Sequence, residues 1–193
     1  MTKIEMADVF AAGCRGRRLY AYRVRGLGRS AVVLWIGGEN DEPDRVLTLP
    51  EVDHCRVPVF TTVRQARLYV SRQGRRLACS EADILELDRV EHWLENPARR
   101  RVPSGSVLDA WNFFEDLARG LGEVHWLPPQ STVHDGAYEK LVGGECAAWT
   151  PEEQGAVLEL ITAGAELWNS CPVIGKPCSR TVFGGGRRSP GGR

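Results

Sequence analysis

Lysine, long apolar runs and closely paired cysteines are scarce or absent in this sequence of 193 residues. Lys3, Lys140 and Lys176 are the lysines among 25 basic residues, an imbalance that we interpret as the codon usage of a high-GC genome. No run of about 18 apolar residues is present, so no membrane-spanning helix is predicted. The start lacks the basic and apolar regions of a signal peptide, and the six cysteines show no Cys-x-x-Cys spacing. We therefore expect a cytoplasmic protein with reduced thiols.

Catalytic and cofactor motifs are also missing. There is no Gly-x-Ser-x-Gly nucleophile motif, no Walker phosphate loop and no dinucleotide-binding glycine pattern. Residues of types that bind zinc do gather within 22 residues, but without the spacing that places two ligands on one face. They are His125, His134, Asp135, Glu145 and Cys146. We expect no catalytic residue, no metal site and no cofactor.

The net charge of zero is a cancellation between three segments. Residues 1–102 carry a net charge of +4, residues 103–174 carry −9, and residues 175–193 carry +5. The last segment is rich in glycine and arginine and has only two large apolar residues, so burial cannot offset the entropy of ordering it. We expect one domain over residues 1–174 followed by a disordered basic tail over residues 175–193.

The first half of the sequence predicts strands followed by a mixed region. Residues 17–25 alternate with the two-residue period of a strand, residues 31–36 form a continuous apolar run, and residues 45–49 follow an acidic loop. Together they predict an antiparallel meander. A short strand at 57–60, a helix beginning with a capping box at Thr62, a strand at 84–87 and a short helix before Pro97 predict a β-α-β-α continuation.

The acidic segment predicts two amphipathic helices. The first, over residues 107–121, has apolar side chains at steps of three and four and a cap at Ser104 or Ser106. The second begins at Thr150-Pro151-Glu152-Glu153, with a cap, a proline at the first helical position and an acid at the third. Residues 123–149 between them predict a long irregular loop, a candidate functional element. The expected fold class is α+β.

Acidic and aromatic side chains occur together in residues 103–174, which hold four of the six tryptophans. Carboxylates around aromatic anchors are typical of surfaces that bind basic proteins, because the charges raise the encounter rate and buried rings supply affinity. The alternative is that the rings close a second small core. The predicted interface residues are Asp109, Asp116, Trp126, Trp149, Glu152, Glu159 and Glu166.

The segment that leads into the first predicted helix resembles segments of other proteins. Val59-Phe60-Thr61-Thr62 leads into a helix containing Gln-Ala, as in several small α+β proteins. With its size and lack of catalytic motifs, the chain resembles the small cytosolic immunity proteins with which bacteria neutralise nuclease-type toxins. The resemblance implies a non-catalytic immunity or inhibitor protein that binds a basic partner protein. It leaves the oligomeric state open.

Two alternatives remain from the sequence. In the first, the chain is a small hydrolase-like enzyme in which the 123–149 loop brings His125, His134 or Cys146 together. In the second, nucleic acid binds to Arg99-Arg100-Arg101, Arg75-Arg76 and the basic tail, although the acidic segment would repel phosphates. We therefore expect a protein partner rather than nucleic acid or a membrane.

Overall fold

The computed structural model describes residues 16–40, 42–50, 55–175 and 178–179, and it confirms the α+β fold class. The elements follow the chain in an order close to that predicted from the sequence. The strands are β1 (Leu19–Gly26), β2 (Arg29–Ile36), β3 (Arg45–Val46), β4 (Leu49–Pro50), β5 (Cys55–Pro58), β6 (Asp83–Glu86), β7 (Val173–Ile174) and β8 (Cys178–Ser179). The α-helices are α2 (Val63–Arg72), α3 (Leu87–Leu94), α4 (Ser104–Leu121), α5 (Thr132–Val142) and α6 (Pro151–Ser170). Two short 3-10 helices are η1 (Val124–Trp126) and η2 (Cys146–Ala148).

The main sheet confirms the predicted meander. Its strands lie in the order β3-β2-β1-β6, with β1, β2 and β3 antiparallel to their neighbours in sequence. The later strand β6 joins β1 in parallel, so that Asp83 pairs with Tyr22 and Leu85 with Val24. This parallel pairing brings residues more than 60 positions apart to one edge of the sheet. A second small sheet has the order β4-β5-β7.

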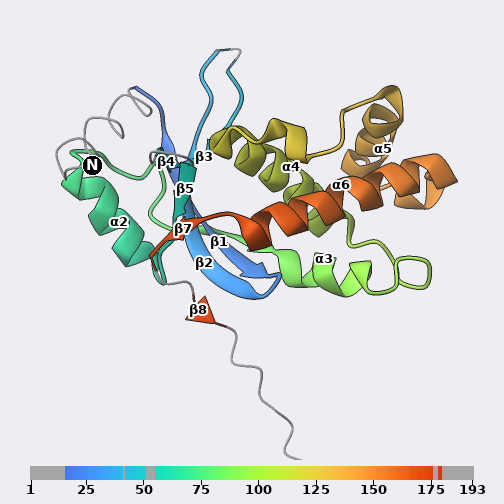
Figure 1. Cartoon of the computed structure of the whole chain (residues 1–193), viewed down its shortest axis with the longest axis horizontal. Coiled ribbons are helices and arrows are strands. Elements are labelled where there is room, and N and C mark those ends of the chain that lie inside the picture. Colours follow the sequence, from blue (N-terminus) through green and yellow to red (C-terminus); the bar gives the residue numbers. More distant parts are fainter. Residues whose placement is uncertain (1–15, 41, 51–54, 176–177, 180–193) are drawn as a thin grey trace, which may run out of the picture.

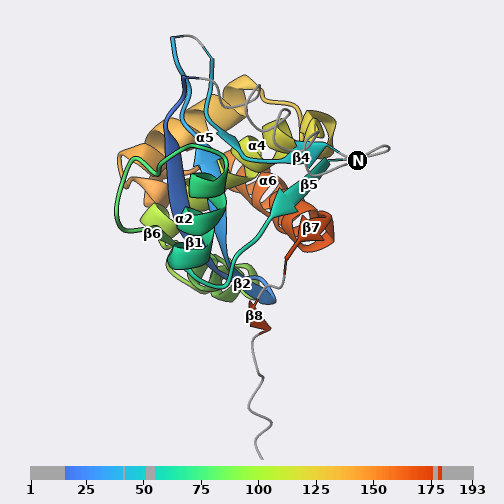
Figure 2. The same ribbon diagram turned by 90° about the vertical axis from the view of Figure 1, so that its left-hand side faces the viewer.

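Strand β2 is buried on both faces, which explains its uninterrupted apolar run. Val32, Leu34 and Ile36 belong to the cluster under α2, whereas Val33 and Trp35 belong to the cluster under the other helices. Figures 1 and 2 show α2 on one side of the sheet and α4, α5 and α6 on the opposite side. The sheet is therefore the middle of three layers.

Capping boxes begin two helices as predicted. The Thr62 side chain accepts from the backbone N–H of Gln65 at the start of α2, and Thr150 accepts from Glu153 at the start of α6. Each helix then buries one side, and the α6 stripe ending at Trp168 lies in the large core. Phe113, which the predicted stripe of α4 omits, is fully buried there.

Three details of the prediction are wrong. Residues 123–149 are not an irregular loop, since they contain α5 and both 3-10 helices. Helix α4 begins after Pro103 without a side-chain cap from Ser104 or Ser106. Helix α3 begins at Leu87, which the predicted strand at 84–87 includes. Tertiary packing, not the local pattern, sets where these helices lie: α5 packs on α4 and α6, whereas α3 and α4 pack on the sheet and on each other.

The predicted tail falls mostly outside the described residues. Within it, Cys178 and Ser179 pair with the start of β2. None of the helices in the described ranges is long and apolar enough to cross a membrane.

Candidate functional site: an acidic cavity with aromatic walls

One face of α4 carries a row of polar side chains that turns toward the sheet. Asp109, Asn112, Asp116 and Arg119 recur at steps of three and four, which places them on one side of a helix. The opposite side of α4 supplies Phe113, Phe114 and Leu117 to the core. Helix α4 therefore both closes the core and presents a polar face.

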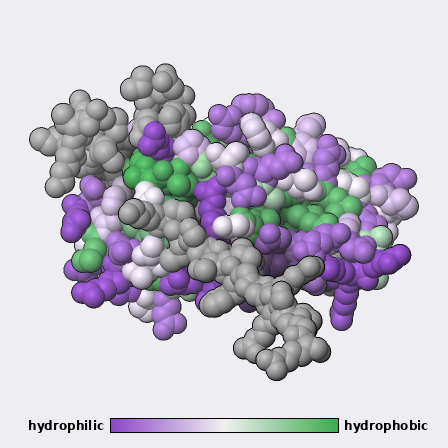
Figure 3. Space-filling view, turned by 60° about the horizontal axis from the view of Figure 1, so that its bottom comes forward, coloured by the Kyte–Doolittle hydropathy of each residue, from purple (hydrophilic) through white to green (hydrophobic). Residues whose placement is uncertain are grey.

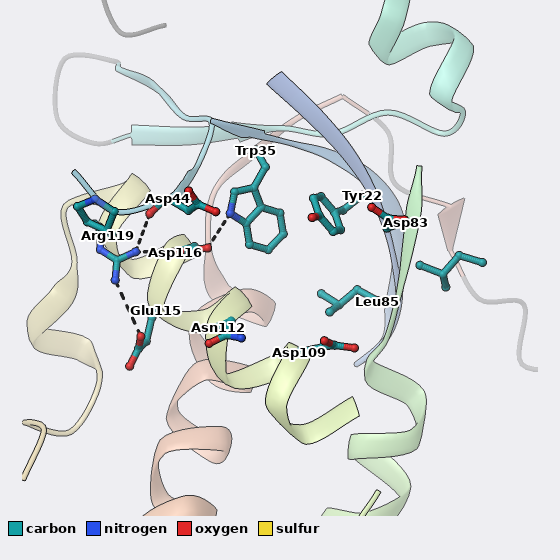
Figure 4. Close-up of a pocket in the computed structure, with 12 residues that line it drawn as sticks. Tyr22, Trp35, Asp44, Asp83, Leu85, Asp109, Asn112, Glu115, Asp116 and Arg119 are labelled. Atoms are coloured by element: carbon teal, nitrogen blue, oxygen red, sulfur yellow. Dashed lines mark hydrogen bonds and ion pairs between the residues drawn. The ribbon is translucent and has the colours of Figure 1, made fainter. Parts of the chain in front are cut away.

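This polar face forms one wall of a cavity of about 530 Å³. Tyr22 of β1, Trp35 of β2 and Leu85 of β6 form the opposite wall, and Asp44 and Asp83 lie at its margins (Figure 4). The rings of Tyr22 and Trp35 have their centroids 4.5 Å apart and are tilted by 56°. The cavity thus combines five carboxylates, one arginine and two aromatic rings.

The end of the cavity near Arg119 contains a counter-charge and is rigid, because hydrogen bonds hold its side chains. The guanidinium of Arg119 forms an ion pair with Asp116 and donates to the backbone carbonyl of Asp44 at 2.6 Å. Trp35 Nε1 donates to Asp116 Oδ2 at 2.6 Å, so the buried carboxylate has a partner on each oxygen. These bonds fix the indole of Trp35 as a wall of the cavity (Figure 4).

The other end of the cavity holds carboxylates without a counter-charge. Asp83 lies there beside the ring of Tyr22 and Asp109 lies on α4 beyond Leu85 (Figure 4), and neither has an ion-pair partner among the described residues. Asp109 is close enough to Glu86 to be affected by its charge. Negative charge therefore accumulates at the open end of the cavity.

Shifted pKa values reflect this charge and the burial. Burial raises the pKa of Asp116 to about 6, against the opposing effects of Trp35 and Arg119. Partial burial and the charge of Glu86 raise the pKa of Asp109. Burial, followed by the charge of Asp83 and other carboxylates, raises the pKa of Tyr22. All three shifts are those expected where negative charge is poorly solvated.

The structure brings two of the predicted interface residues, Asp109 and Asp116, into this cavity. Trp126 is 47% exposed in η1 and is not among the residues that line the cavity. Trp149 is partly buried and donates through Nε1 to the carbonyl of Ala137 at 3.0 Å, so it joins α5 to the start of α6. The remaining predicted interface residues lie exposed along α6 and do not line the cavity; they are Glu152, Glu159 and Glu166.

The other residues that line the cavity were missed from the sequence, among them Tyr22, Trp35, Asp83 and Arg119. Tyr22 could have been suspected, because strand alternation places it opposite the Leu19 face. Trp35 gave no signal, since it stands inside a continuous apolar run. Asp83 reaches the site only through the parallel pairing of β6 with β1, which no local pattern predicts.

The candidate catalytic groups are distributed over different surfaces. His125 lines a hollow beside Pro128, whereas His134 lines another beside Trp111, and Cys146 lines neither. His134 is buried with Nδ1 2.9 Å from Ser131 Oγ. Burial raises the pKa of the Cys146 thiol, which disfavours the reactive thiolate. Nothing in this arrangement supports the enzyme alternative.

Neither a metal site nor a related protein identifies the function of this chain. Within the described part of the chain, no group of three or more histidine, cysteine or carboxylate side chains is arranged to hold a metal ion. No protein-family model matches the chain, and no curated protein or solved structure matches it either. The face shown in Figure 3 is mainly hydrophilic, with separate hydrophobic areas. The geometry of the acidic cavity is therefore the main guide to function.

Proposed function

We propose that this protein is a non-catalytic module that binds a basic partner protein and receives a cationic side chain of that partner in the acidic cavity. The observation that supports this most is the pair of carboxylates, Asp83 and Asp109, that line the cavity without a counter-ion among the described residues. An arginine or lysine side chain would supply that missing charge.

The walls of the cavity suit a cation that carries apolar surface. A guanidinium or ammonium group can lie against an aromatic face, an interaction of about 0.5–2 kcal/mol depending on how far it is desolvated. The methylene groups of the same side chain can pack on Tyr22 and Leu85 while its charged end meets Asp83 or Asp109. A small anion or a phosphate would be repelled by the same groups.

The charge of the surrounding segment supports a protein rather than a small ligand. Residues 103–174 have a net charge of −9, and Glu152, Glu159 and Glu166 add exposed carboxylates on α6. Such a field raises the rate of encounter with a basic protein at low ionic strength. We assign the α6 glutamates this steering role and the cavity the contact role.

The biological role we propose is that of a cytoplasmic immunity or inhibitor protein. The chain offers no catalytic arrangement among its described residues, and a protein that works by covering a basic partner needs none. This role extends the resemblance drawn from the sequence. The acidic cavity is the site at which such a protein would contact its partner.

A binding experiment with matched peptides tests the proposal. Fluorescein-labelled nona-arginine and its neutral counterpart nona-citrulline are titrated with the protein, and anisotropy is followed at 50 to 500 mM salt. We expect binding of the arginine peptide only, weakening as salt screens the charges. The variant D83N/D109N should weaken binding by on the order of tenfold or more, as expected for close charge pairs.

The variant E159Q/E166Q is the matched control, because it removes the same charge from α6. It should slow association and change the affinity at low salt by a few-fold at most. Equal losses in both variants, or a larger loss in the α6 variant, would place the contact outside the cavity. Equal binding of the arginine and citrulline peptides would contradict the proposal as a whole.

A further inference from the structure

A second hollow lies directly beside the acidic cavity. Its volume is about 660 Å³, and it shares Glu115 and Arg119 with the lining of the cavity. The rest of its lining comes from α4 and the segment that follows, including Val124, Leu127 and Pro128. The two hollows are therefore neighbours on one surface, separated by the Glu115–Arg119 pair.

The second hollow is apolar where the first is acidic. Val124, which is 61% exposed, lines it together with Leu127 and Pro128. The backbone here is held by η1 and by Pro128-Pro129, so the apolar side chains are presented by a constrained segment. Exposed apolar side chains gathered in a hollow are typical of binding sites.

The wall between the hollows is held in place on both sides. Glu115 accepts from Trp111 Nε1 and from Gln130 Nε2, each at 2.9 Å, while Arg119 is held by Asp116 and by the Asp44 carbonyl. Arg119 is paired with Asp116 and Glu115, so this wall attracts a second cation less than the end of the cavity that holds Asp83 and Asp109. A segment with an apolar residue near its cationic residue would therefore suit the two hollows better than a run of basic residues.

We infer that the two hollows together bind an extended segment of the basic partner, in which an arginine or lysine enters the acidic cavity and a nearby aliphatic side chain enters the apolar hollow. This inference rests on the proposed function and specifies its partner. The acidic cavity requires a positively charged residue in the segment. Because the two hollows share Glu115 and Arg119 in their linings, the apolar residue must lie close to that charged residue.

The test uses acetylated, amidated peptides in a glycine-serine background. One series contains a single arginine and a single leucine separated by zero, one, two or three residues, and the reference peptides contain arginine alone or leucine alone. Binding is followed by NMR through the indole N–H signal of Trp35, which reports on the cavity, and the backbone amide signals of Val124 and Leu127, which report on the apolar hollow. We expect one arginine-leucine spacing to bind at least tenfold more tightly than arginine alone.

Two variants with the same substitution separate specific from general effects. Val124→Ser should remove the gain from leucine and leave arginine-only binding unchanged. Val142→Ser changes a side chain that is 59% exposed at the end of α5 and lines neither hollow, so it should change nothing. Native indole spectra of both variants verify that they fold.

The outcomes distinguish this inference from the proposed function. If arginine-only peptides bind as tightly as every arginine-leucine peptide, or if both valine variants behave alike, the inference is overturned and the basic-partner proposal stands. If no arginine-containing peptide binds at any spacing, including nona-arginine, the proposed function itself is wrong.

Discussion

Replacing Gly120 with alanine is expected to lower the free energy of unfolding by about 1–3 kcal/mol, the usual cost of inserting a methyl group into a close-packed contact. A Cβ at this position would lie 2.3 Å from the backbone oxygen of Val46 and 3.3 Å from a methyl group of Thr48. Because a backbone oxygen cannot move aside as a flexible side chain can, α4 would have to shift away from β3.

The same shift would disturb the cavity. Thr48 Oγ1 donates to the carbonyl of Gly120 at 2.5 Å, and the next residue toward the N-terminus, Arg119, holds Asp116. Helix α4 thus meets the sheet at Gly120 and carries the polar face of the cavity from that point. We expect Gly120→Ala to weaken peptide binding as well as to destabilise the fold.

Gly155→Ala is the matched control. Gly155 also lies inside a helix, but a Cβ there would meet no atom within 4 Å. Alanine should therefore stabilise the protein by about 0.5–1 kcal/mol, because it loses less backbone entropy on folding than glycine does. Urea unfolding measures both variants. Similar midpoints for the two would mean that α4 does not approach β3 as closely as the structure shows.

Local patterns in the sequence were sufficient for most elements of the fold. Alternation gave the strand around Tyr22, the apolar run gave β2, and the capping boxes at Thr62 and Thr150 gave the starts of α2 and α6. These features depend on interactions within a few residues of the chain. They can therefore be predicted without knowledge of the tertiary structure.

Helix α5 and the ends of two other helices were not predictable in this way. The α5 sequence has a glycine, Gly136, in its interior and little apolar periodicity, and its buried residues, such as Ala137 and Leu141, meet α4 and α6. Tertiary packing supplies the stability that local propensity lacks. The prediction of an irregular loop failed because it weighed only the local pattern.

The candidate site was only half predictable for a related reason. Asp109 and Asp116 share a helix with the predicted acidic surface, so the charge pattern found them. Their partners Trp35 and Asp83 come from strands on other parts of the chain, and a cavity depends on how those strands pair. A sequence pattern can indicate a charged face, but it cannot show which side chains will stand opposite to it.

Asp116 is expected to make the folded protein more stable as the pH falls from about 7 to 4. Burial raises its pKa in the folded protein to about 6, from an ordinary value of 3.8. Between these two values the folded protein binds a proton that the unfolded chain does not, so a rising pH through 6 favours unfolding and a falling pH favours folding. At 1.36 kcal/mol for each pKa unit, the contribution is about 2–3 kcal/mol.

The difference between wild type and Asp116→Asn isolates this contribution from that of other carboxylates. Asparagine can still accept from Trp35 Nε1 but cannot titrate, so the free energy of unfolding of wild type, minus that of the variant, should rise as the pH is lowered from 7 to 4. Urea unfolding at several pH values measures it. A difference that is independent of pH would show that the Asp116 carboxyl titrates alike in the folded and unfolded states.

Trp35→Phe gives a second readout that depends on the same hydrogen bond. The indole N–H lowers the pKa of Asp116 by donating to its ionised form, and phenylalanine keeps an aromatic wall without a donor. The carboxyl carbon of Asp116, followed by NMR, should therefore titrate at a higher pH in this variant than in wild type. An unchanged titration would mean that the indole does not hold the carboxylate. The rigid end of the cavity would then depend on Arg119 alone, and the open end beside Asp83 and Asp109 would be less well formed for a cationic side chain.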